Sequence, residues 1–84
     1  MDFYLGVNME YTKLSFLGDP LVLCTVRDFL RTQAYVIGIY DVSEGEFYCV
    51  VRRHVADSIK TNVEKVFPSV KVTREDWNQP SQPT

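Results

Sequence analysis

Catalytic chemistry has few candidate residues in this sequence. His54 is the single histidine, and it directly follows Arg52 and Arg53. A serine or cysteine nucleophile needs a positioned general base, and no nucleophile-elbow pattern supplies such a pair here. The acids of residues 41–46 sit in a short polar break, where a solvated turn is their ordinary role. We therefore expect a protein that is not an enzyme.

The cationic run Arg52-Arg53-His54 is a candidate binding site. An amphipathic helical pattern starts just after it, and the backbone N–H groups at the start of a helix attract anions. Asp57 lies in the first turn of that helix, so charge pairing with Asp57 and with other acids of the chain is the competing role for the three side chains. We keep Arg52, Arg53 and His54 as weak anion-binding candidates.

Metal and cofactor chemistry has little support in the sequence. Cys24 and Cys49 lie far apart inside apolar patterns, and no Cys-x-x-Cys motif or Cys/His cluster exists. The glycines are scattered, so no glycine-rich phosphate loop is present. We expect no metal, no cofactor, and two reduced, buried cysteines that act as small apolar residues.

The composition is that of one small globular domain. The sequence has 84 residues, of which 45% are apolar and 24% charged, with a formal net charge of −2. A domain of this size has little core, and a partner is one common means of stabilising it. The negative net charge counts against a main role in nucleic-acid binding. Without a basic leader region or an apolar run near ~20 residues, we expect a cytoplasmic protein that does not enter a membrane.

Alternation of apolar and polar residues predicts a strand at the start of the chain. Apolar side chains occupy every odd position from Phe3 to Tyr11. At Thr12 the phase slips by one, and Leu14 and Phe16 become the apolar positions. The slip indicates either a bulge in one long strand or a second short strand over residues 12–17, which would add a fifth strand to the sheet.

Two helices and a central hairpin follow. Asp19 and Pro20 are a good N-cap and first helical residue, and helical spacing continues to about Thr32. A second helical pattern runs over residues 55–67 and stops before a proline. Between them, residues 35–53 form two β-branched and aromatic runs around the polar break, the pattern of a β-hairpin. Residues 70–73 alternate like a short strand, and residues 75–84 are polar and proline-containing.

The order strand, helix, strand, strand, helix, strand predicts an α+β fold. It is the order of the ferredoxin-like βαββαβ two-layer sandwich, whose antiparallel sheet has four strands here, or five if residues 12–17 form a strand of their own. Right-handed crossovers place the two helices on one face of that sheet. We expect a single domain over residues 1–74 and a disordered tail over residues 75–84.

The opposite, open face of the sheet is the candidate functional surface. We expect the helix-facing core to contain Phe3, Leu5, Val7, Ile37, Ile39, Phe47, Cys49 and Val51. We expect the open face to present the candidate protein-binding residues Tyr4, Val36, Tyr40, Tyr48, Val50 and Arg52. Such a face is too apolar for an idle surface, and tyrosine and arginine are enriched at interface hot spots. The sequence therefore favours a non-catalytic, regulatory protein-binding domain, an adaptor or inhibitor, whose first candidate partner is a second copy in a homodimer.

Two other interpretations stay open. The topology resembles that of RNA-recognition motifs, which stack single-stranded bases on strand aromatics. That resemblance would make Tyr4, Tyr40 and Tyr48 stacking platforms and put Arg52 and Arg53 on phosphates. Residues 45–51 only loosely resemble the glycine- and aromatic-rich signature of that family, and an acid replaces the expected basic residue before it. In the third interpretation, residues 12–17 or the tail fold over the open face and complete the core.

Overall fold

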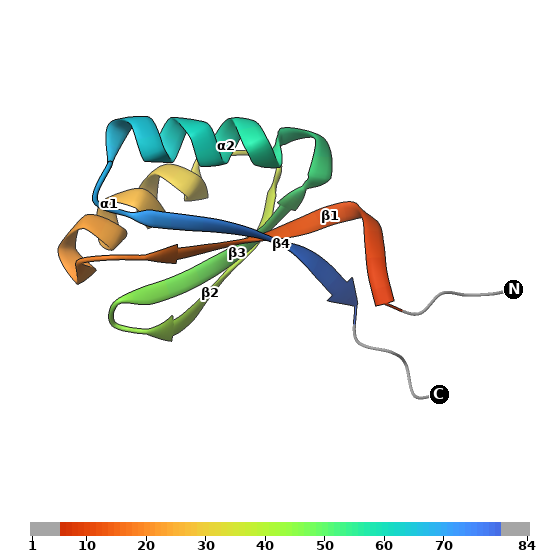
Figure 1. Ribbon diagram of the computed structural model, residues 1–84, viewed down its shortest axis with the longest axis horizontal. Coiled ribbons are helices and arrows are strands. Elements are labelled where there is room, and N and C mark those ends of the chain that lie inside the picture. Colours follow the sequence, from red (N-terminus) through yellow and green to blue (C-terminus); the bar gives the residue numbers. More distant parts are fainter. Residues whose placement is uncertain (1–5, 80–84) are drawn as a thin grey trace, which may run out of the picture.

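The sheet has four antiparallel strands and both helices cover one of its faces. The computed structural model describes residues 6–79, with the side chains of residues 10–75. Its elements are β1 (Gly6–Leu17), α1 (Pro20–Arg31), β2 (Val36–Ser43), β3 (Glu46–Arg52), α2 (Arg53–Val66) and β4 (Lys71–Gln79). The strand order is β2-β3-β1-β4, which is compatible with the order expected for a ferredoxin-like sandwich. The α+β class predicted from the sequence is confirmed (Figure 1).

β1 is one long strand, and the slip in its apolar pattern is a bulge. Residues 12–17 form no separate strand, because β1 runs without a break from Gly6 to Leu17. They pair with β3 on one side and with β4 on the other. The register with β4 shifts between Val7 and Thr12, at the point where the sequence pattern changes phase. Figure 1 shows β1 bending sharply within its N-terminal half.

The bulge decides which residues of β1 form the core. Leu14 and Phe16 are fully buried beneath the helices, and Thr12 is buried with them. The Thr12 hydroxyl donates a hydrogen bond to the Glu75 carbonyl oxygen at 2.7 Å, which satisfies the buried polar group. Of the core residues expected from the odd positions, Phe3 and Leu5 lie outside the described residues, as does the side chain of Val7.

The helices form where local chemistry predicts. The Asp19 carboxylate accepts backbone hydrogen bonds from Leu21 and Val22 at 3.0 and 3.3 Å, which caps α1. α2 begins at Arg53, two residues before the predicted start, and ends before Pro68. The helical residues that are buried in the core are Leu23, Val26, Leu30, Ala56, Ile59 and Val63. No helix in the described part of the chain is long and apolar enough to span a bilayer.

A bulge in β2 corrects the predicted faces of that strand. The pairing of β2 with β3 shifts between Val36 and Gly38, which leaves Ile37 as the extra residue. Val36, expected on the open face, therefore packs against the helix-side core, and Ile39 does so too. Ile37, expected in the core, is exposed. β3 has no such irregularity, and Phe47, Cys49 and Val51 are fully buried as expected.

The sheet extends further toward the C-terminus than the sequence suggests. β4 continues to Gln79, and its last residues pair with Gly6 and Val7 of β1. The prediction of a tail from residue 75 is therefore wrong for residues 75–79, because a backbone ladder forms without an apolar side-chain pattern. Residues 80–84 lie outside the described residues.

Removal of a core aromatic ring should destabilise the domain strongly. The Phe47 ring stacks on Phe16 with 4.8 Å between ring centroids, and both rings are fully buried. We expect Phe47→Ala to lower the free energy of unfolding by ~3–5 kcal/mol in urea denaturation. Phe29 of α1 is exposed, so Phe29→Ala should cost less than about 1 kcal/mol. Similar losses for the two variants would contradict this core.

Candidate functional site: the open face of the sheet

The open face consists of the side chains that alternate with the core residues along each strand. The register brings together side chains from all four strands. They are Gly38 and Tyr40 of β2, Tyr48, Val50 and Arg52 of β3, Tyr11, Lys13 and Ser15 of β1, and Thr73 and Glu75 of β4.

A stacked tyrosine pair dominates the end of this face at β2. The rings of Tyr40 and Tyr48 lie 5.1 Å apart between centroids, with 27° between their planes. Gly38 makes room for the arrangement, because a Cβ at position 38 would lie 2.5 Å from the Tyr40 Oη. The Tyr40 ring therefore lies over the strand backbone beside the Tyr48 ring. This packing fixes an aromatic surface at the edge of the sheet.

Charged side chains occupy the part of the open face that lies toward β4. Lys13 Nζ lies 4.5 Å from the centroid of the Tyr48 ring and 3.6 Å from Glu75 Oε1. The Ser15 hydroxyl donates a hydrogen bond to Glu75 Oε2 at 3.5 Å. The open face thus changes from aromatic at β2 and β3 to charged and internally paired at β1 and β4.

The structure brings together some of the predicted binding residues and separates others. Tyr40 and Tyr48 are adjacent, and Val50 lies on the same face but is buried. The exposed Arg52 guanidinium lies 5.7 Å from the Tyr11 ring centroid. Val36 belongs to the opposite, helix-facing side, as described above. Tyr4 lies outside the described residues.

Sequence reasoning missed several residues of this surface, which are Ile37 of β2, Tyr11, Lys13 and Ser15 of β1, and Glu75 of β4. Ile37 is exposed on β2, and its signal in the sequence is that this strand has no polar face. Val42 is exposed as well, and strand alternation already places it on the side of Tyr40. Lys13 and Glu75 join the face through the pairing of β1 with β4. That pairing has no local signal, because it depends on the register of two strands at opposite ends of the chain.

The cationic run at the start of α2 gains little support as an anion site. Arg52, Arg53 and His54 line a depression of about 370 Å³, but Glu10 lines it as well. An acidic side chain in the same depression opposes anion binding. The carboxylate of Asp57 lies 2.8 Å from Nη1 of Arg74.

The described residues offer no metal cluster, and one of the two thiols is buried. No group of three or more histidine, cysteine, aspartate or glutamate side chains gathers among the described residues in a way that could hold a metal ion. The two cysteines are free, and Cys24 is exposed on α1, contrary to the expectation that both are buried. Burial raises the pKa of the Cys49 thiol from 9.0 to about 12. Cys49 therefore stays protonated at neutral pH and is a poor nucleophile.

The two thiols should differ in reactivity. In the folded protein, we expect a thiol reagent such as Ellman's reagent to modify Cys24 and leave Cys49 untouched. Both should react after unfolding in guanidinium chloride. The variant Cys24→Ser is the control, and it should show no fast reaction when folded. Fast modification of Cys49 in the folded variant would contradict its place in the core.

The sequence matches no protein-family model, and a comparison with curated proteins finds no match. The function proposed below therefore depends on the geometry of this chain's own residues.

Proposed function

We propose that this chain is a non-catalytic protein-binding domain of the ferredoxin-like type that associates with a second copy through the aromatic end of its open face. The observation that carries the proposal is the exposure of large apolar side chains along β2. Ile37, Tyr40 and Val42 are exposed to 54%, 46% and 56%. An edge strand of a monomer gains nothing from such side chains, whereas an interface gains ~25 cal/mol for each Å² of apolar surface that it buries.

The anatomy of the face supports this role. Tyr40 and Tyr48 form an aromatic centre, and Lys13, Arg52 and Glu75 lie on the same face with charged groups. An apolar, aromatic centre with a polar rim is the common arrangement of protein interfaces. Stacking already restricts the two tyrosine rings, so binding would cost little further side-chain entropy.

A regulatory role suits this chemistry better than turnover of a substrate. Among the described residues, the face contributes apolar contact, cation–π pairs and one ion pair, and the Glu75 carboxylate beside Ser15 is already paired with Lys13. An adaptor or inhibitor needs contact of this kind only. We place this activity in a cytoplasmic, reducing compartment, which suits an exposed and a buried free thiol.

Single-stranded nucleic acid is the alternative ligand. Lys13 and Arg52 lie close to the rings of Tyr48 and Tyr11 on the two central strands, where bases could stack. However, the Tyr48 ring already has Tyr40 on the β2 side and Lys13 on the β1 side, so a base would have to displace one of them. Glu75 adds an acid to the same face. These contacts favour the protein partner.

Light scattering of the purified chain over a concentration series tests the proposal. We expect a dimer or larger species that dissociates on dilution and has the same mass at low and high salt, because its interface is apolar. Tyr40→Glu should give a monomer with an unchanged circular dichroism spectrum, since the Tyr40 ring lies on the surface and a buried charge would oppose only the association.

Thr73→Glu is the matched control for this experiment. Thr73 lies in the same row of the sheet as Tyr40, at the opposite edge, so its variant should still associate. A wild-type chain that is monomeric at every concentration would contradict self-association. Tight binding of an oligouridine that weakens steeply with salt would favour the nucleic-acid alternative instead.

A further inference from the structure

The outer edge of β2 is unprotected over the regular stretch Gly38–Asp41, which lies between the two register shifts of this strand. β2 pairs only with β3 in the described sheet, and its sequence Val-Ile-Gly-Ile-Tyr-Asp-Val-Ser contains no lysine or proline. Such an edge presents unpaired backbone N–H and C=O groups that a further strand can bind. β4, at the other edge, carries the charged residues Lys71, Arg74 and Glu75. The pairing edge is therefore at β2.

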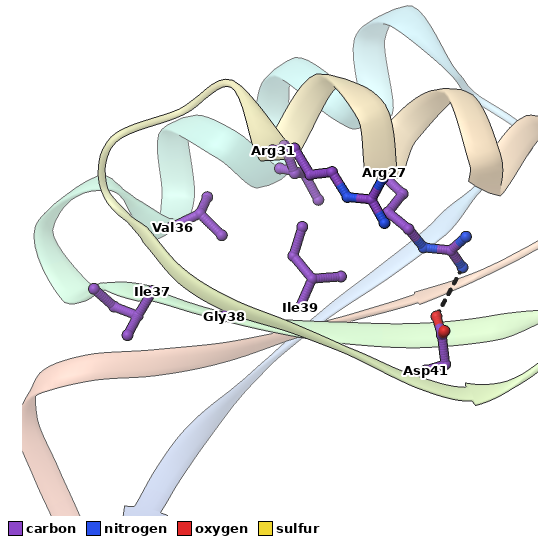
Figure 2. Close-up of a pocket in the computed structure, with 8 residues that line it drawn as sticks. Arg27, Arg31, Val36, Ile37, Gly38, Ile39 and Asp41 are labelled. Carbon is purple, nitrogen blue, oxygen red and sulfur yellow. Dashed lines mark ion pairs between the residues drawn. The ribbon is translucent and has the colours of Figure 1, made fainter.

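A groove follows this edge between β2 and α1. It has a volume of about 350 Å³, and the apolar side chains that line it are Leu30, Val36, Ile37 and Ile39. Figure 2 shows Val36 and Ile39 pointing from β2 toward α1, whereas Ile37 points away. The groove thus joins an open backbone edge to an apolar surface on the helix side of the sheet.

Two arginines of α1 make the groove positive. Arg27 lies beside Asp41, with 2.9 Å between Nη2 and Oδ1, and its guanidinium lies 4.9 Å from the Phe47 ring centroid. Arg31 has only a loose contact with Asp28, 3.7 Å between Nη1 and Oδ1, and both of these side chains are exposed. Asp41 is the one acid among the residues that line the groove. The Arg31 guanidinium therefore retains donors for a further carboxylate.

We propose that this groove binds an extended peptide segment of a partner protein that carries an acidic side chain. The segment adds to the sheet as a strand beside β2, over the regular stretch Gly38–Asp41. Its carboxylate, on the helix-facing side, pairs with Arg31, and its apolar side chains contact Val36 and Ile39. This inference rests on the proposed protein-binding function but uses a different surface.

The charges favour such a peptide over a second copy at this edge. Two copies paired through β2 in one continuous antiparallel sheet would place both α1 helices on the same face, next to each other. Arg27 and Arg31 of each copy would then approach those of the other, with only the two Asp41 carboxylates between them. An acidic peptide supplies the opposite charge without this repulsion.

Selection from a library of displayed seven-residue peptides on the immobilised full chain tests the inference. We expect enriched peptides with one acidic residue at a fixed position among alternating β-branched residues. A chosen peptide, labelled with fluorescein, should bind roughly tenfold more weakly to Arg31→Glu than to the wild type, because the variant repels the carboxylate. Lys65→Glu, a similar exposed cation in the last turn of α2, should leave binding unchanged.

The variants separate this inference from the proposed function. Peptides that bind Arg31→Glu normally but fail to bind Tyr40→Glu would occupy the open face, and would overturn the groove inference while supporting that function. The absence of any enriched peptide, or enrichment without an acid, would also overturn it. A wild-type dimer that Arg31→Glu dissociates would show that a second copy occupies the edge in place of a peptide.

Discussion

The structure depends on the bulge in β1 between Val7 and Thr12. Since side chains alternate between the two faces of a strand, a single register shift exchanges the faces of everything that follows it. The shift turns Leu14 and Phe16 toward the helices and leaves Lys13 and Ser15 on the open face. β1 pairs with both β3 and β4, and paired residues point to the same face of a sheet. The register of β1 therefore determines which residues of β3 and β4 lie in the core and which lie on the open face. The same register shift therefore determines which side chains form the core and which form the candidate binding face.

The open face has an ion pair at one side and packed tyrosines at the other, and both stabilise the monomer. It also keeps exposed apolar side chains that a partner protein can contact. At the β4 side, Lys13 and Glu75 pair with each other, which satisfies their charges. At the β2 side, the tyrosines pack on each other and on a glycine, yet large apolar side chains remain exposed. β2 thus lies between two surfaces, the aromatic end of the open face and the groove beneath α1. Its exposed edge is what connects both proposals.

Local chemistry made much of the fold predictable. Asp19 and Pro20 mark the start of α1, and Pro68 limits α2, because capping and proline act within one turn of a helix. The shared face of Tyr40 and Tyr48 was predictable too, because side chains alternate along each arm of the hairpin. Their direct pairing was not, because the register shifts between Asp41 and Ser43, which lie between the pair and the turn. The face of Val36 and the length of β4 were not, because a bulge and a pairing between distant strands depend on contacts far apart in the sequence.

A nuclear magnetic resonance concentration series would test the central claim, that the aromatic end of the open face is an interface. The account predicts that backbone amide signals of Tyr40, Val42 and Tyr48 move progressively as the chain is concentrated. Signals from the outer surfaces of the helices, such as those of Leu21 and Val66, should stay in place, although both side chains are exposed and apolar. Shifts centred on Leu21 and Val66, with Tyr40 and Tyr48 unaffected, would contradict the account.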